Sequence, residues 1–314
     1  MVQDQHQALI QGILRSIVQD CDQVASACQL LRQHGIDYAS DPRLQRSFRN
    51  LQQYLPERPS KLLRLKEALS EGHMSTVAKE FPIGTIIPDI WKNVQTNAMY
   101  SIPHIIVDYG NYKSPEKDEL RQGAILLRQY LLPVEVPFSS DLDEYKTSHI
   151  HRWLNGQASV PSLPSSLPPC EPAPKEYPSY SAGCSPELLQ VVSPISQVTR
   201  EYRDGKPVLT HYDSRFFLPS RHNLNLADPD GELNIGEVWS YFAYNATRDP
   251  RQACPGRVFC GVTGIPDVYQ LKDVYMMDEP DGYRHRQGVD TQGCSISIKP
   301  TYPHFCTVAC AVIA

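Results

Sequence analysis

The sequence predicts an α+β protein, in which a helical module at residues 1–76 precedes a β-rich domain at residues 77–314. Two observations favour this division. Apolar residues recur at steps of three and four over residues 4–34, which is the periodicity of one helix face. From Phe81 onward, β-branched and aromatic runs are interrupted by Gly and Pro, which is typical of strands.

Capping signals divide the helical module into three helices. The first covers residues 4–34 and ends at Gly35, and the second covers residues 42–54 after a Ser-Asp-Pro start. Ser60 caps a third helix, which stops at Gly72. The apolar stripe of the first helix has two interpretations: it packs against the two shorter helices, or its heptad-like spacing lets the chain form a homo-oligomer. The module is expected to attach or oligomerise the protein.

Several apolar segments of the β-rich domain are predicted strands. MYSIPHIIVDYG (99–110) and GEVWSYF (236–242) have strand composition, whereas the even apolar run AILLRQYLLPVEVPF (124–138) fits either a strand or a helix. The final HFCTVACAVIA (304–314) is apolar on nearly both faces. This pattern predicts a central strand that is covered on both sides.

Two short helices are predicted on either side of a loop. The segment YKTSHIHRWLNG forms a short helix that ends at Asn155 and Gly156, and Ser185 caps another helix with Pro186 in its first turn. Residues 157–183 hold seven prolines and many serines. They are therefore predicted to form a loop.

Composition argues against two classes of protein. The chain has 30 Lys and Arg against 35 Asp and Glu, and a net charge of -5 is unlike that of a nucleic-acid-binding domain. No apolar run approaches the roughly 18 to 20 residues that span a bilayer. The Gln-rich N-terminus lacks the pattern of a secretory signal. The protein is therefore expected to be made and folded in a cytoplasm and to have no nucleic-acid or membrane partner.

No metal, cofactor or catalytic residue is predicted. The nine cysteines are interpreted as mostly buried thiols, since no CxxC pair occurs and Cys306 and Cys310 would lie about 13 Å apart along a strand. His149 and His151 are interpreted as surface or capping residues. The carboxylates at 228–232 resemble a calcium loop in composition, and a conformational turn is the favoured interpretation. Phosphate-binding loops, GxSxG elbows and HExxH motifs do not occur in the sequence.

One surface is predicted to bind a ligand. Tyr, Trp and Arg dominate the energetics of interfaces, because each combines a large buried area with a polar group. These residue types gather between Trp239, which is itself assigned to the core, and Arg286. The predicted ligand-binding residues are Tyr241, Tyr244, Asn245, Arg248, Arg251, Tyr283, Arg284 and His285.

The order of several short motifs resembles a group of structural proteins from phages and gut bacteria. The motifs WLNG (153–156), DSRFFLPS (213–220), GEVWSYF and the apolar terminal strand carry the resemblance, which begins at about Phe81. Proteins of this group end in a C-type-lectin-like domain. The same fold occurs in formylglycine-generating-enzyme-like proteins and in the variable proteins of diversity-generating retroelements. The resemblance therefore implies a C-type-lectin-like mixed β/α domain whose long loops carry ligand contacts.

The leading functional hypothesis is a non-enzymatic virion structural protein, either a tail or receptor-binding protein or a capsid decoration or fibre protein. Its N-terminal helices would contact other virion proteins, and its lectin-like domain would bind a host surface protein or glycan. One alternative is a purely architectural assembly protein. Another is a formylglycine-generating-like enzyme that uses Cys254, Cys260, Cys306 or Cys310.

Overall fold

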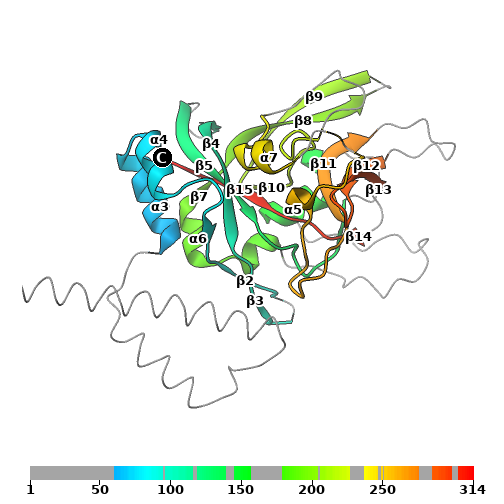
Figure 1. Ribbon diagram of the computed structural model, residues 1–314, viewed down its shortest axis with the longest axis horizontal. Helices are drawn as coiled ribbons and strands as arrows, with labels where there is room; N and C mark the ends of the chain where they lie inside the picture. Colours follow the sequence, from blue (N-terminus) through cyan, green and yellow to red (C-terminus); the bar gives the residue numbers. More distant parts are fainter. Residues whose placement is uncertain are drawn as a thin grey trace, which may run out of the picture. The chain divides into compact units, whose positions relative to one another are not determined.

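An antiparallel sheet of six strands forms the centre of the computed structural model (Figure 1). The structure describes residues 60–94, 96–115, 119–138, 145–156, 179–203, 206–226, 237–246, 249, 251–275, 285–298 and 303–314. All of these residues belong to one compact unit, Pro59–Ala314. In spatial order the strands are β1 (Ile86–Ile87), β4 (His104–Ser114), β5 (Glu119–Arg128), β15 (Ala309–Ile313) and β10 (Phe216–Phe217), with β7 (Val192–Ser193) also paired to β15.

The last strand, β15, lies inside this sheet. It pairs with β5 along its whole length, and its other edge pairs first with β10 and then with β7. The side chains of Cys310 and Val312 enter one hydrophobic core. Those of Ala309, Ala311 and Ile313 enter a second core. The predicted central strand with two covered faces is confirmed, since all five residues are buried.

Each face of the sheet is covered by a different layer. One core receives side chains from α3 (Lys61–Glu71), α4 (Met74–Glu80), α5 (His149–Asn155) and α6 (Pro186–Val191). The other receives side chains from the segment around α7 (Ser240–Asn245) and from β11 (Tyr269–Tyr275) and β12 (His285–Val289). These two strands form a three-stranded sheet with β13 (Ser295–Ile298). Helix α3 packs against β15 and α6, so it shares the core of the sheet.

Three two-stranded pairs complete the described strands. The longest is a hairpin of nine paired positions between β8 and β9, which forms one wall of the pocket described below. The pairs are β8 (Ile195–Arg203) with β9 (Lys206–Ser214), β2 (Ile90–Lys92) with β3 (Met99–Ser101), and β6 (Val136–Pro137) with β14 (Pro303–His304).

The predicted fold class is wrong. The expectation was an α+β chain with an N-terminal helical module and a C-type-lectin-like mixed β/α domain, whereas the described structure is mostly β, with a half-barrel sheet and few helices. The described helices are only 6 to 11 residues long. The core is organised instead by the sheet: β4 and β5 form a long antiparallel pair, and β15 pairs with the other edge of β5. The helices predicted at residues 4–34 and 42–54 lie outside the described residues.

Local capping signals predicted four helix boundaries correctly. The Ser60 hydroxyl accepts from the backbone N–H of Leu63 at 3.3 Å, and α3 ends before Gly72. At α6 the Ser185 hydroxyl accepts from the Leu188 N–H at 3.1 Å, and Pro follows in the first turn. Helix α5 ends at Gly156, whose φ of 74° is left-handed and favours glycine.

In one further segment the structure contradicts the prediction, and in another it decides between the two alternatives that the sequence left open. The GEVWSYF segment was predicted to be a strand, but Ser240–Asn245 is helix α7. Its N-terminus is held by the carboxylate of Asp108, which comes from distant β4 and gives no signal in the local sequence. The ambiguous run at 124–138 is a strand as far as Arg128, where β5 ends, and it pairs again at Val136–Pro137.

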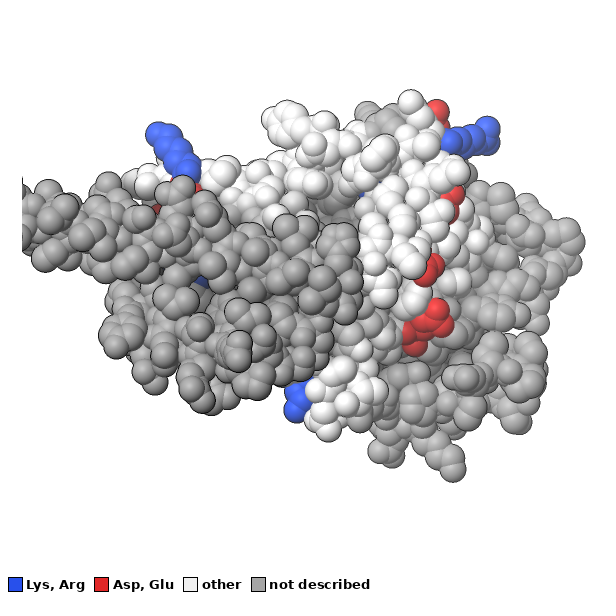
Figure 2. Space-filling model, turned by 60° about the horizontal axis from the view of Figure 1, so that its bottom comes forward, with Lys and Arg blue, Asp and Glu red and all other residues white. Residues whose placement is uncertain are grey.

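The face shown in Figure 2 is largely uncharged over the described residues, with acidic side chains along one side and basic side chains set apart from one another. Within the described segments, none of the helices combines the length and apolar character needed to cross a bilayer.

Candidate functional site

Helix α7 brings three of the predicted ligand-binding residues together. Tyr244 is 86% exposed, Asn245 is exposed, and Tyr241 is half-buried with its ring edge-on to Phe242 at 5.2 Å. On the inner side of the helix, Phe242 is fully buried. Trp239, which precedes the helix, is buried as predicted. One side of the helix therefore exposes aromatic and amide side chains, while its other side is packed in the core.

The other predicted residues are placed only in part. Arg251 is exposed, and its carbonyl accepts from the Cys294 thiol at 3.5 Å. His285 lies at the start of β12, where it pairs with Tyr275. Three predicted residues lie outside the described residues: Arg248, Tyr283 and Arg284.

Both ends of α7 are held by contacts with other elements. At the N-terminus, an Asp108 carboxylate oxygen accepts from the Ser240 hydroxyl at 2.7 Å and from its backbone N–H at 3.3 Å. Burial raises the pKa of Asp108, and the Ser240 hydrogen bonds oppose this rise. At the C-terminus, a Cβ added to Gly256 would lie 2.1 Å from the Asn245 carbonyl oxygen, so that position is restricted to glycine. The exposed side chains of α7 consequently project from an anchored helix.

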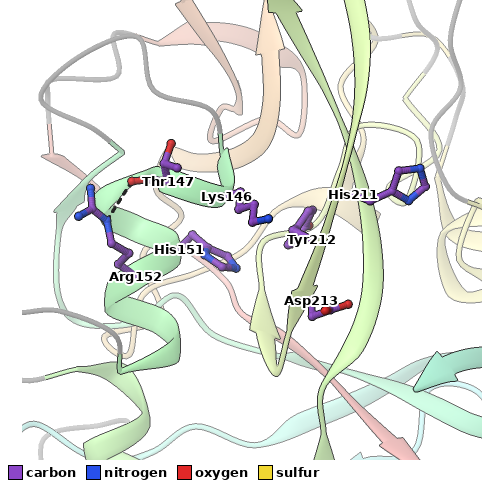
Figure 3. A pocket seen from close by; sticks show the side chains of 7 residues that line it. All are labelled: Lys146, Thr147, His151, Arg152, His211, Tyr212 and Asp213. Atoms are coloured by element: carbon purple, nitrogen blue, oxygen red, sulfur yellow. Dashed lines mark hydrogen bonds between the residues drawn. The ribbon is translucent and has the colours of Figure 1, made fainter. Parts of the chain in front are cut away.

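A pocket of about 610 Å³ opens between α5, the preceding 3-10 helix Tyr145–Thr147, and β9 (Figure 3). Its size falls in the ordinary range for small-molecule sites. Sequence analysis did not predict it, because its two walls are about 60 residues apart along the chain. The lining residues are Lys146, Thr147, His151, Arg152, His211, Tyr212 and Asp213.

Three aromatic rings pack together at the pocket, and two of them, those of His151 and Tyr212, line it. Tyr145, His151 and Tyr212 contact one another edge to face, with ring centroids 5.2 to 5.3 Å apart. The Tyr145 hydroxyl also accepts from the Leu218 N–H at 2.9 Å. These contacts fix the position of the His151 ring.

His151 is the buried polar residue of this pocket. Its side chain is only 3% exposed, and neither ring nitrogen makes a hydrogen bond of good geometry with a described residue. Desolvation lowers the pKa of His151 to about 4, with a smaller opposing effect from the nearby Lys146 carbonyl. The ring is therefore neutral near pH 7 and retains hydrogen-bonding capacity towards the pocket.

The interpretation of His149 and His151 as surface or capping residues is wrong. Both are buried, at 4% and 3% exposure. Helix α5 is a short element whose neighbours Ile150, Trp153 and Leu154 are also buried, so nearly every side of it is covered. Two histidines on different sides of such a helix are therefore both buried.

A lysine lies behind the pocket wall. The Lys272 ammonium group donates to Gln197 Oε1 at 3.0 Å and lies 3.4 Å from the hydroxyl of Tyr212. It also lies 5.9 Å from the centroids of the Tyr212 and Phe217 rings. Desolvation lowers the pKa of Lys272 to about 8, and Asp273 opposes this shift. The hydroxyl of Tyr212 is thus directed towards the core, and its ring faces the pocket.

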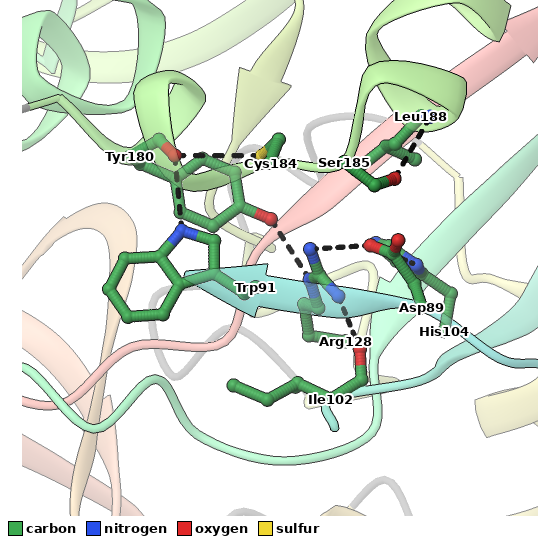
Figure 4. Close-up of polar contacts among 9 residues, drawn as sticks. All are labelled: Asp89, Trp91, Ile102, His104, Arg128, Tyr180, Cys184, Ser185 and Leu188. Carbon is green, nitrogen blue, oxygen red and sulfur yellow. Dashed lines mark hydrogen bonds and ion pairs between the residues drawn. The ribbon is translucent and has the colours of Figure 1, made fainter. Parts of the chain in front are cut away.

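A second buried polar cluster, drawn in Figure 4, includes residues that flank the β2–β3 hairpin: Asp89, which precedes β2, and Ile102, which follows β3. The guanidinium group of Arg128 is fully buried, donates to the Tyr180 hydroxyl at 2.9 Å and to the Ile102 carbonyl, and lies 2.8 Å from the Asp89 carboxylate. Burial and the charge of Arg128 lower the pKa of His104, which faces Asp89 at 3.8 Å. We interpret this cluster as structural, because its members connect the hairpin, the sheet and the Tyr180–Gly183 turn.

The described cysteines are free thiols, and four of them are buried as predicted, including Cys306 and Cys310. Burial raises the pKa of Cys306 to about 12, so the unreactive thiol form dominates near neutral pH. In the part of the chain that the structure describes, no three His, Cys, Asp or Glu side chains converge as a metal site requires. The carboxylates at 228–232 lie outside that part.

Comparisons with protein-family models, curated proteins and solved structures found no match for this chain.

Proposed function

We propose that this chain is a non-enzymatic binding protein that uses the exposed side of α7 to contact a partner protein. The observation that carries this proposal is the 86% exposure of Tyr244 on a helix whose opposite side is fixed in the core. Tyrosine loses little conformational entropy when it is buried by a partner, since it has only two side-chain torsions.

The composition of the α7 surface supports a protein as the partner. Tyr and Arg are enriched among the residues that dominate protein interfaces, and Tyr244 and Arg251 are both exposed. Asn245 supplies polar contacts: its Nδ2 donates to the Tyr241 carbonyl at 2.7 Å, and its side-chain oxygen is available for a partner. Anchoring at Asp108 lowers the cost of ordering the helix on binding.

The virion setting remains a prediction from the sequence resemblance. In that setting the partner is a host surface protein, and the N-terminal residues contact other virion proteins. The fold expected from the resemblance was wrong, so the proposal rests on the α7 surface itself and does not depend on a lectin-like scaffold.

Binding of the purified chain to host cells and to their extracted surface proteins tests the proposal. Tyr244→Ala is expected to weaken binding by about 2 kcal/mol, or roughly 30-fold, if Tyr244 is a central contact. Met99→Ala is a matched control, since Met99 is 67% exposed on β3. Unchanged binding of Tyr244→Ala would contradict the proposal. Recognition of an isolated glycan on an array, with the same loss in Tyr244→Ala, would instead identify a glycan as the partner.

A further inference from the structure

The pocket beside α5 has the features of a small-molecule site that is separate from α7. Its volume of about 610 Å³ is sufficient for a ligand of ordinary metabolite size. Lys146 and Arg152 line it from the side of α5, and Asp213 on β9 is the one carboxylate among the described residues that line it. This basic character contrasts with the net charge of -5 of the whole chain. An anionic ligand fits such a lining.

The buried imidazole provides an independent reason to expect a ligand. His151 is 97% buried, given its 3% exposure, and at least one of its ring nitrogens has no hydrogen-bond partner among the residues that the structure describes. An unpaired buried polar atom is costly, and a ligand that enters the pocket can satisfy it. In Figure 3 the His151 ring lies next to Lys146, and the Tyr212 ring, whose centroid is 5.3 Å from that of His151, lies on the facing strand.

The arrangement of the two cations favours phosphate over carboxylate. Arg152 turns away from the centre, and its Nε donates to the Thr147 carbonyl at 2.9 Å (Figure 3). The cation that faces His151 is therefore Lys146, which acts as a point charge. Lys is a common phosphate ligand of this kind, and a phosphate monoester, with a charge of about -1.5 to -2 near pH 7, is attracted to a point charge more strongly than a carboxylate with a single charge.

We propose that this pocket binds a small molecule with a phosphate monoester group, which contacts Lys146 and His151 while its uncharged part packs on the ring of Tyr212. The Asp213 carboxylate limits the affinity for anions, and its acceptance of the Ser196 hydroxyl at 2.7 Å partly compensates its charge. This site is independent of the α7 proposal, since the two surfaces share no residue.

Calorimetric titration of the full chain with phenyl phosphate tests the site, with benzoate and phenol as comparison ligands. We expect phenyl phosphate to bind more tightly than benzoate, and phenol to bind least. The ring 15N signals of His151 should shift during the phenyl phosphate titration. Equal binding of benzoate would overturn the choice of phosphate, and equal binding of phenol would overturn the anionic site.

Substitutions assign the binding to this pocket. Lys146→Gln should weaken phenyl phosphate binding roughly tenfold, since it removes a charge-assisted hydrogen bond. Lys79→Gln, at an exposed position of α4, is the matched control and should bind like the wild type. His151→Phe keeps an aromatic ring but removes both nitrogens, and it should also weaken binding. Lys146 is exposed, so Lys146→Gln remains informative if His151→Phe fails to fold. Unchanged affinity in Lys146→Gln, or absence of phenyl phosphate binding to the wild type, would refute the proposal.

Discussion

The imidazole rings of His104 and His151 are enclosed in a protein core that disfavours their charged form. Burial lowers the pKa of both, and for His151 the value is about 4. In the unfolded chain the same groups titrate near pH 6.5. Below pH 6.5 the unfolded state therefore binds protons that the folded state does not accept, and acid favours unfolding.

The pH dependence of stability should reveal this effect at His151. As pH falls from 6.5 to 4, the wild type is expected to lose about 3 kcal/mol more free energy of unfolding than His151→Phe. The reason is that the pKa of His151 is about 2.5 units lower in the folded state than in the unfolded state, and each unit corresponds to 1.36 kcal/mol. Urea unfolding at several pH values measures the difference. Parallel stability curves for the two proteins would show that His151 titrates normally in the folded state.

The buried ion pair between Asp89 and Arg128 leads to a second expectation at this scale. Asp89→Asn leaves the fully buried Arg128 without its counter-charge and should cost about 3 to 5 kcal/mol in the free energy of unfolding. Glu80→Gln is the control, because Glu80 pairs with Arg64 where both side chains are more than 40% exposed. That change should cost less than about 1 kcal/mol. Equal effects of the two substitutions in urea unfolding would contradict the burial of the Asp89 pair.

Sequence reasoning was weakest for single polar side chains. Tyr244 was correctly assigned to the surface and Trp239 to the core, because residue type and local pattern agree with their positions. His151 and Arg128 were not recognised as buried. Their burial depends on elements that are distant in sequence, so local patterns carry no information about it.

At the scale of elements, one side chain connects α5 to the sheet. The amide nitrogen of Asn155 donates to the Phe216 carbonyl at 3.0 Å and to the Ser214 hydroxyl at 3.1 Å. Its oxygen accepts from the backbone N–H groups of Arg215 and Phe216 at 3.0 and 3.1 Å. The Asn of the WLNG motif therefore positions the helix that carries His151 against the end of β9.

Removal of this amide should loosen the pocket wall. Asn155→Ala leaves the backbone N–H groups of Arg215 and Phe216 without the acceptor that Asn155 supplies, and it is expected to lower the free energy of unfolding by about 2 kcal/mol. Asn111→Ala on β4 is the comparison, since Asn111 is exposed and should change stability by less than about 0.5 kcal/mol. A thermal unfolding midpoint that is the same for both variants would exclude this role of Asn155.

Helix boundaries were predictable where the capping group is local and not where it is remote. Ser60 and Ser185 each cap a helix that begins at the next residue, so a short sequence window contains the signal. Helix α7 has its capping carboxylate on Asp108, more than 130 residues earlier, and its aromatic composition suggested a strand. The α5 pocket was missed for the same reason, since Lys146 and Tyr212 meet only in the folded chain.

For the whole molecule, the last strand joins the two cores. Alternate residues of β15 enter opposite cores, and the strand pairs along both edges. The apolar character of both faces made this position predictable from sequence. The fold class was not predictable in the same way, because strand order depends on pairing between β5 and β15, which are separated by about 180 residues.

Hydrogen exchange of the β15 amides tests the central claim that the last strand lies inside the sheet. Amides of Ala309–Ile313 are expected to exchange only through global unfolding, so their opening free energy should equal the unfolding free energy measured with urea. Amides of the short β3 strand, Met99–Ser101, should exchange much faster. If the β15 amides exchanged as rapidly as those of β3, the strand would lie at an edge, and the arrangement of both cores would be wrong.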